Sequence, residues 1–328
     1  MLRLADAHGR VATDLRVSLT DRCNLRCSYC MPAEGLDWLP HDSTLTDDEV
    51  IQLITIAVER LGVTEVRFTG GEPLLRSGLE RIVAATASLG VPTALTTNGI
   101  GLARRAEALA AAGLHRVNVS LDTLSPERFT EITRRPRLND VLTALTAASD
   151  AGLRPVRVNA VLLRGINDDE APALLEFCLA HGYDLRFIEQ MPLDPMHTWD
   201  RASFVTAAEI LDVLAARWTL EPVEEDRGGE PAESWLVDGG PARVGIVGSI
   251  TRPFCAACNR TRLTADGQIR NCLFALTETD LRGALRRGAD AEEIALIWQA
   301  AMAGKAAGHG VDDDSFQQPD RPMSAIGG

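Results

Sequence analysis

Six segments with a strand-like pattern are each followed by a helical or turn pattern, and this alternation constrains the fold more than any other feature. Strands are predicted over residues 16–20, 65–69, 93–97, 116–121, 155–163 and 185–191, and helices from Thr46 and over 77–89, 101–112, 139–151 and 169–181. Repeated strand–helix units form a parallel sheet with right-handed crossovers. Six units are too few for a closed eight-stranded barrel. We therefore predict an α/β fold built on a partial (β/α)6 TIM-type barrel, with a doubly wound sheet as the alternative.

Local signals agree with this alternation. "TDDE" is typical of a capping box, in which Thr46 and Glu49 exchange hydrogen bonds at the start of a helix. Glycines follow the predicted helices where a left-handed C-cap is expected, at positions 62, 90, 113, 152 and 182. In both candidate folds, ligands bind at the carboxyl ends of the strands, so we expect the functional residues there.

The alternation stops near residue 192. A short helix near 206–217 and a few antiparallel strands follow, including "ARVGIVGSI". We predict a domain of residues 1–195, the partial barrel, and a smaller α+β domain of residues 196–328. Residues 224–233, "EEDRGGEPAE", are expected to form an exposed loop with no assigned role. The last residues have the composition of a frayed tail.

Charge and hydropathy exclude two classes of partner. The chain has 33 Lys and Arg against 46 Asp and Glu, a net charge of −13, and an acidic chain is a poor candidate for general nucleic-acid binding. It has no apolar run of about 18 residues, the length that suggests a membrane span, and "MLRLADAHGR" lacks a signal-peptide core. We predict a cytoplasmic protein that binds neither nucleic acid nor membrane. Its oligomeric state is left open, a homodimer included.

Six of the seven cysteines form two groups of three. Cys23, Cys27 and Cys30 lie within "SLTDRCNLRCSYCMP", directly after the first predicted strand, and Cys255, Cys258 and Cys272 have the spacing C-x2-C-x13-C. In a protein that is not secreted, such clusters indicate metal rather than disulfides. The seventh, Cys178 in "LLEFCLA", is expected to be a buried core thiol.

Three thiols on one loop can hold three corners of a [4Fe–4S] cluster and leave the fourth iron open, whereas an electron-carrying ferredoxin closes all four corners. An open iron can bind a small molecule. The alternative is a zinc knuckle that lacks its fourth ligand. For the second group, the cysteines alone favour zinc, with a histidine such as His309 completing a Cys3His site.

The C-x3-C-x2-C spacing after the first strand closely resembles that of the radical S-adenosylmethionine (SAM) superfamily. The resemblance implies that the open iron chelates SAM and that one electron cleaves SAM to methionine and a 5′-deoxyadenosyl radical. "FTGGEP" (68–73) is similar to the superfamily segment that binds the SAM amino group. The same resemblance assigns four residues to SAM: Tyr29, Gly71, Ser120 and Met191.

The string "CAACNRTRLTADGQIRNC", together with "TTNG" (96–99), "NVSLD" (118–122) and the Gly-Gly end, resembles the GTP 3′,8-cyclase family over essentially the whole chain. That family catalyses the first step of molybdenum cofactor biosynthesis, from GTP to 3′,8-cyclo-7,8-dihydro-GTP. The resemblance implies a second [4Fe–4S] cluster on Cys255, Cys258 and Cys272, whose open iron contacts guanine. It also implies a reducing electron donor, a downstream pyranopterin-forming enzyme, and a catalytic role for Gly327 and Gly328.

A nucleoside triphosphate brings about four negative charges, so an acidic protein needs local cations to bind it. Arg260 and Arg262 flank Thr261, and alternation in an extended segment would point both guanidinium groups the same way. Their forked donors suit phosphate oxygens. The resemblance assigns seven residues to GTP: Arg16, Arg67, Thr96, Arg157, Arg260, Thr261 and Arg262.

The sequence departs from the family pattern in two respects, and two rival functions are considered. The family often carries lysine at the position of Arg157, and the acidic loop has no counterpart role. One rival is a peptide-modifying radical SAM enzyme with an auxiliary cluster, although such proteins usually carry more C-terminal cysteines. The other is a non-catalytic metal-binding scaffold.

Overall fold

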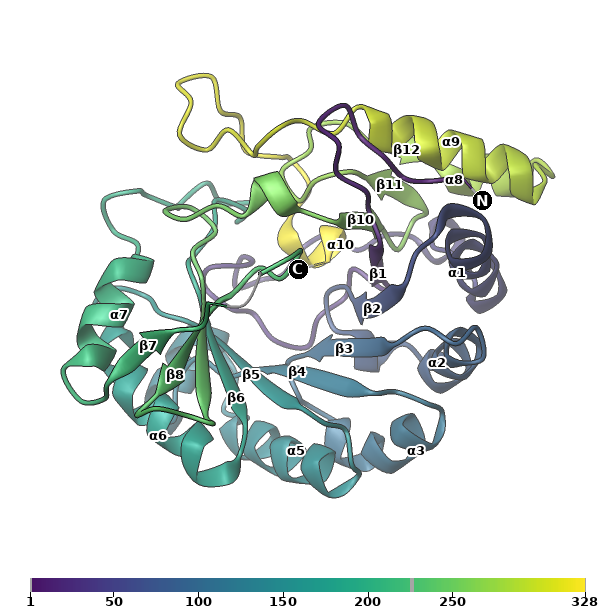
Figure 1. Ribbon diagram of the computed structural model, residues 1–328. Coiled ribbons are helices and arrows are strands. Elements are labelled where there is room, and N and C mark those ends of the chain that lie inside the picture. Colours follow the sequence, from purple (N-terminus) through teal and green to yellow (C-terminus); the bar gives the residue numbers. More distant parts are fainter. Residues whose placement is uncertain (1, 225–226, 328) are drawn as a thin grey trace.

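A computed structural model describes residues 2–224 and 227–327, and within these residues one curved sheet of twelve strands dominates the molecule (Figure 1). The strand order is β12-β11-β10-β1-β2-β3-β4-β5-β6-β9-β8-β7, and all pairs from β10 through β1 to β6 and β9 are parallel. The strands are β1 Asp14–Ser18, β2 Glu65–Thr69, β3 Thr93–Thr97, β4 Arg116–Ser120, β5 Val156–Val161, β6 Asp184–Ile188, β7 Leu220–Pro222, β8 Glu233–Val237, β9 Arg243–Val247, β10 Arg260–Leu263, β11 Gln268–Arg270 and β12 Thr279–Asp280.

The helices lie mainly on the convex side of the sheet, and the inner side holds the C-terminus (Figure 1). They are α1 Asp47–Leu61, α2 Leu79–Ala87, α3 Ala106–Ala111, α4 Pro126–Thr133, α5 Leu138–Asp150, α6 Ala171–His181, α7 Ala207–Ala215, α8 Leu281–Arg286, α9 Ala291–Ala303 and α10 Met323–Ile326. None of the described helices is long and apolar enough to cross a membrane.

The period of two along each strand explains why the sheet has two unlike faces. In β5, Val156, Val158 and Ala160 are buried in the hydrophobic core, whereas the alternate residues Arg157 and Asn159 line cavities of the opposite face. The apolar side chains therefore pack between sheet and helices, and the inner face is left polar. This arrangement confirms the predicted α/β partial barrel.

The predicted start and end signals of the first helix are both confirmed. Thr46 and Glu49 form the capping box of α1, with the Thr46 N–H 2.8 Å from Glu49 Oε2, and Gly62 ends the helix at φ +76°. Cys178 is fully buried in α6. Helix α4, which Ser125 caps, was not expected. The helix predicted over 101–112 consists of a short 3-10 turn and α3.

The strands after residue 195 extend both edges of the barrel sheet rather than forming a sheet of their own. Strand β10 pairs parallel with β1, and β9 pairs parallel with β6 while β8 runs antiparallel beside it. The sequence predicted only antiparallel pairing for β9, and the structure adds a parallel pairing with β6. The predicted boundary at 195 falls in the loop between β6 and α7, so both predicted domains contribute to one sheet.

The composition of the last residues predicts a frayed tail, and this expectation was wrong for the described part of it. The chain returns to the inner face, where α10 forms and Ile326 is buried. Gly328 lies outside the described residues.

Candidate active site

The first thiol group sits on the loop after β1, and the "GGEP" segment after β2 packs directly against that loop. The N–H of Gly71 donates to the carbonyl of Thr20 at 2.7 Å, and the N–H of Glu72 donates to that of Arg22 at 2.8 Å. A Cβ on Gly71 would overlap the backbone oxygens of the cysteine loop. The glycine is therefore required because two backbones meet here, and not only because a ligand approaches.

Glu72 ties this segment to "TTNG". Its buried carboxylate accepts from the Leu74 N–H at 2.9 Å, the Thr97 hydroxyl at 2.7 Å and the Asn98 N–H at 2.7 Å. Burial raises the pKa of Glu72 to about 7 despite these donors. The side-chain amide of Asn98 in turn lies 3.7 Å from Cys23 Sγ. The loops after β1, β2 and β3 thus form one connected unit.

The structure brings together every residue that the sequence assigns to SAM. A cavity of about 240 Å³ is lined by Cys23, Cys27, Cys30, Tyr29, Gly71, Ser120 and Met191, and also by Thr96. The Tyr29 hydroxyl donates to Asp122 Oδ2 at 2.8 Å, and Oδ1 of Asp122 accepts from the Val161 N–H at 2.9 Å. Burial raises the pKa of Asp122 to about 6. Asp122, which the sequence analysis missed, therefore orients Tyr29.

The second thiol group lies next to the start of β10. His309 does not complete a zinc site here, because both of its ring nitrogens are in use: Nε2 is 3.0 Å from the Ser249 carbonyl, and Nδ1 accepts from the Val311 N–H at 3.0 Å. Among the described residues, no three His, Cys, Asp or Glu side chains converge to hold a single ion.

Each donor set is chemically compatible with three corners of a [4Fe–4S] cluster. Each consists of three thiols, and each thiolate of a [4Fe–4S] cluster binds a different iron, so the sulfurs need not converge. Burial raises the pKa of the Cys30 thiol to about 12. At neutral pH such a thiol ionises only when a metal binds it.

Arginines crowd the inner face beside the second thiol group. The predicted residues Arg16, Arg67, Arg157, Arg260 and Arg262 lie there, and two further arginines that the sequence analysis missed, Arg116 and Arg186, complete the set. Among the described residues, seven guanidinium groups thus face four carboxylates: Asp14, Glu65, Asp184 and Glu230. Arg116 in β4 and Arg186 in β6 alternate in step with the inward-facing residues of their strands. The two-residue period of a strand could therefore have predicted that both side chains face inward.

Several of these guanidinium groups have buried nitrogens without a hydrogen-bond partner in the described protein. The atoms are Arg67 Nε, Arg116 Nη1, Arg157 Nη1 and Arg260 Nε. Burial and the neighbouring Arg16 lower the pKa of Arg262 to about 9. Buried donors are normally paired, so this cluster has the character of an anion site that the protein itself does not fill.

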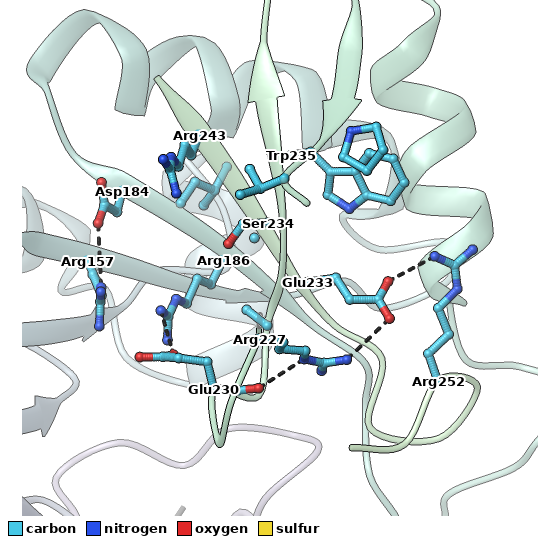
Figure 2. A pocket seen from close by; sticks show the side chains of 15 residues that line it. Arg157, Asp184, Arg186, Arg227, Glu230, Glu233, Ser234, Trp235, Arg243 and Arg252 are labelled. Atoms are coloured by element: carbon cyan, nitrogen blue, oxygen red, sulfur yellow. Dashed lines mark hydrogen bonds and ion pairs between the residues drawn. The ribbon is translucent and has the colours of Figure 1, made fainter. Parts of the chain in front are cut away.

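A cavity of about 550 Å³ opens beside this cluster, at the end of the sheet where β5, β6 and β9 begin (Figure 2). Arg157 lies 3.5 Å from Asp184, and Arg186 lies 3.0 Å from Glu230 of the acidic loop. The carbonyl of Gly229 accepts from Arg260 at 2.7 Å. The loop is therefore not merely an exposed feature, since it places a carboxylate and a carbonyl against the arginines.

Two predicted GTP residues do not have their side chains in the arginine cluster: Thr96 lines the cavity of the first thiol group, and Thr261 faces the opposite side of the sheet. Arg260 and Arg262 face inward, as alternation predicts, so Thr261 points the other way. Its buried hydroxyl accepts from the indole N–H of Trp298 in α9 at 2.9 Å. Only its backbone remains close to the inner face.

The tail contacts the first thiol group and the arginine cluster. The backbone N–H of Ser324 donates to Cys30, and the carbonyl of Gly327 accepts from Arg262 on β10. Gly327 has φ +84°, and a Cβ there would overlap Ser18 Oγ and lie 2.7 Å from Thr69 Cγ2. Glycine is therefore the residue that this position admits.

Comparison with known proteins agrees with this geometry. Residues 17–178 match the Radical SAM superfamily, and residues 183–311 match Molybdenum Cofactor Synthesis C. The GTP 3′,8-cyclase of Streptomyces coelicolor (strain ATCC BAA-471 / A3(2) / M145) is 65% identical, covering 99% of this chain and 96% of that protein. That of Mycobacterium sp. (strain KMS) is 62% identical, covering 99% and 93%. The chain belongs to the GTP 3′,8-cyclase family.

Membership of this family makes the chain a radical SAM enzyme, which implies a [4Fe–4S] cluster and SAM. Among solved structures, Streptococcus suis SuiB bound to S-adenosylmethionine has a TM-score of 0.61 at 15% identity, covering 97% of this chain and 76% of that one. The same protein bound to precursor peptide SuiA gives 0.62 at 15% identity, covering 96% and 76%. At this identity the likeness shows the fold alone, so it does not favour the peptide-modifying alternative.

Proposed function

We propose that this enzyme cyclises GTP to 3′,8-cyclo-7,8-dihydro-GTP with two [4Fe–4S] clusters that face each other across the barrel interior. The observation that carries the proposal is the group of buried arginine nitrogens without a hydrogen-bond partner in the described protein, in a cluster whose Arg260 lies beside Cys258. A triphosphate supplies the missing acceptors, and its negative charge offsets the excess of three guanidinium groups over carboxylates among the described residues.

In this proposal Cys23, Cys27 and Cys30 hold the cluster that binds SAM. When bound, the cluster and SAM supply the 5′-deoxyadenosyl radical. Tyr29 packs near the adenine, and Gly71, Ser120 and Met191 line the rest of the SAM cavity. Their placement at the strand ends supports this assignment.

Cys255, Cys258 and Cys272 hold the second cluster, whose open iron takes the guanine. Arg16, Arg67, Arg157, Arg260 and Arg262 bind the triphosphate, and the position of Arg186 supports adding it to the set. Thr96 lines the SAM cavity near Asn118, whose amide is 3.4 Å from the Thr96 hydroxyl, and it would meet the nucleotide from that side. Thr261 contributes through its backbone alone, because its side chain faces Trp298.

The residues of the site hold C3′ of GTP toward the SAM cavity and C8 of guanine beside the ribose. A hydrogen atom would pass from C3′ to the 5′-deoxyadenosyl radical, the C3′–C8 bond would form, and one electron and one proton would convert the resulting nucleotide radical to the product. The electron comes from a reducing donor, and a separate pyranopterin-forming enzyme consumes the product. Gly327 and Gly328 exclude water and position the substrate from the tail side, a role supported by the contact between Gly327 and Arg262.

Anaerobic reconstitution tests the proposal. The protein should contain about eight irons per chain, in two cubanes, and should convert GTP in the presence of SAM and dithionite to a product with the mass of GTP. Cys27→Ala should abolish SAM cleavage, and Cys258→Ala should prevent GTP turnover while leaving the first cluster assembled. About four irons with one zinc, or iron–sulfur protein without SAM cleavage, would instead support the scaffold alternative.

A further inference from the structure

The two thiol groups lie among charges of opposite sign. Around the first group the charged neighbours are the carboxylates Glu72, Asp122 and Asp194 and one cation, Arg26, and the side chains that donate toward the sulfurs are neutral, the amide of Asn98 and the hydroxyl of Tyr29. Around the second group the charged neighbours are cations, as the following contacts show.

Lys305 is the single lysine of the chain, and it is buried against the second group. Its ammonium lies 3.2 Å from Cys258 Sγ, 3.2 Å from the Cys258 carbonyl and 2.9 Å from the Arg260 carbonyl. An ammonium has three N–H donors, so these three acceptors use all of them. No carboxylate in the described part of the chain forms an ion pair with Lys305.

Arg10 fixes the segment that carries Lys305. Its Nη1 donates to the carbonyls of Cys255 at 2.7 Å and Ala307 at 2.9 Å, and its Nη2 donates to that of Ala306 at 2.6 Å. Asp6 holds the same guanidinium from the other side at 2.6 Å. The segment after α9 is thereby clamped to the cysteine loop, and the ammonium is held beside the sulfur.

The reduction potential of an iron–sulfur cluster depends on net charge, on hydrogen bonds to its sulfurs and on solvent exposure. A positive charge and an N–H donor at a ligand sulfur stabilise the reduced state, which carries one more negative charge. Carboxylates have the opposite effect. We propose that Lys305 raises the reduction potential of the second cluster above that of the first, an inference that rests on the two-cluster function proposed above.

The consequence concerns which cluster can reduce SAM. Its acidic surroundings keep the first cluster a strong reductant, which cleavage of a sulfonium requires. The reduced second cluster is the weaker reductant, so Lys305 confines SAM cleavage to the site where Cys23, Cys27 and Cys30 hold the iron. Lys305 is in this sense a positioning and tuning residue that acts through Cys258.

The test is an EPR-monitored redox titration of each cluster by itself, in proteins whose other three cysteines are replaced by alanine. The second cluster should have the higher potential. Lys305→Met should lower its reduced-to-oxidised ratio at fixed ambient potential by about tenfold, which corresponds to about 59 mV for one electron. Lys305→Arg should stay within about threefold of the wild type, and the same changes should leave the first cluster unaffected.

Lys305→Gln removes the positive charge but keeps hydrogen-bond donors. It also serves as a second test in case Lys305→Met does not assemble the second cluster. Since it keeps N–H donors for the two carbonyls, it should assemble the cluster and still lower the potential. The comparison of the two cluster potentials in the wild-type sequence tests the proposal without any Lys305 variant. Equal or reversed wild-type potentials, or an unchanged potential in Lys305→Met and Lys305→Gln with full iron content, would overturn this inference alone. Zinc in place of the second cluster would overturn the two-cluster function itself.

Discussion

Replacing Gly327 by alanine perturbs the tail at one well-defined point. The residue has φ +84°, its neighbours Ser18 and Thr69 leave no room for a Cβ, and its carbonyl accepts from Arg262. An alanine must therefore move away from both strand ends, and the hydrogen bond to Arg262 is lost with it.

The size of the effect follows from these two contributions. A sparsely populated backbone conformation with positive φ, such as φ +84° and ψ +105° at Gly327, costs a residue with a Cβ about 1–3 kcal/mol, and a hydrogen bond to a charged group contributes about 1.5–3 kcal/mol. Together they lower the docking equilibrium constant of the tail by about 100-fold or more, since about 1.4 kcal/mol is a factor of ten. We expect both clusters to assemble and most GTP affinity to remain, while the yield of cyclised product falls by at least about tenfold.

The assay is anaerobic turnover, with iron content and GTP affinity measured on the same preparation. Gly239→Ala is a matched control, because Gly239 also has a positive φ, of +81°, but nothing lies within 4 Å of its Cβ position. That variant should turn over like the wild type. A chain ending at Ile326 should resemble Gly327→Ala. Wild-type product yield from both tail variants would refute the argument and would mean that the tail contact does not serve the chemistry.

Three further outcomes follow from the arginine cluster and the first thiol group. Arg260→Ala and Arg262→Ala should each weaken GTP binding by about ten- to a hundredfold in calorimetry without loss of SAM binding, and unchanged affinity in both would rule out their contact with phosphate. Glu230→Gln should tighten GTP binding by about two- to fivefold, because a half-exposed carboxylate that competes for Arg186 contributes only about 0.5–1 kcal/mol; weaker binding would mean that Glu230 contacts the substrate favourably. Cys27→Ala should yield no 5′-deoxyadenosine even with the second cluster intact, and its formation would remove Cys27 from the ligand set.

Local signals predict the elements of the barrel well, because propensity and packing agree there. The capping box at Thr46 and the alternation in β5 are both present as expected. Helix α4 was missed although Ser125 caps it and Pro126 opens it, since its eight residues are too few to show a clear helical period.

Pairing between distant segments could not be predicted in the same way. Strand β10 lies beside β1 although Arg16 and its partner Arg262 are 246 positions apart in the sequence, and no local pattern encodes that contact. The tail is a similar case, because its composition disfavours order and its position depends on Arg262, Cys30 and the space between β1 and β2. The candidate ligands were found by motif, whereas the roles of Lys305 and Asp122 became visible only through their neighbours.

The most direct test of the proposed chemistry uses GTP deuterated at C3′. After anaerobic turnover with SAM and reductant, the deuterium should appear in 5′-deoxyadenosine, and the wild-type protein should release the 3′,8-cyclo product. Unlabelled 5′-deoxyadenosine formed together with that product would contradict hydrogen abstraction at C3′, and 5′-deoxyadenosine formed without any cyclised nucleotide would contradict GTP as the substrate.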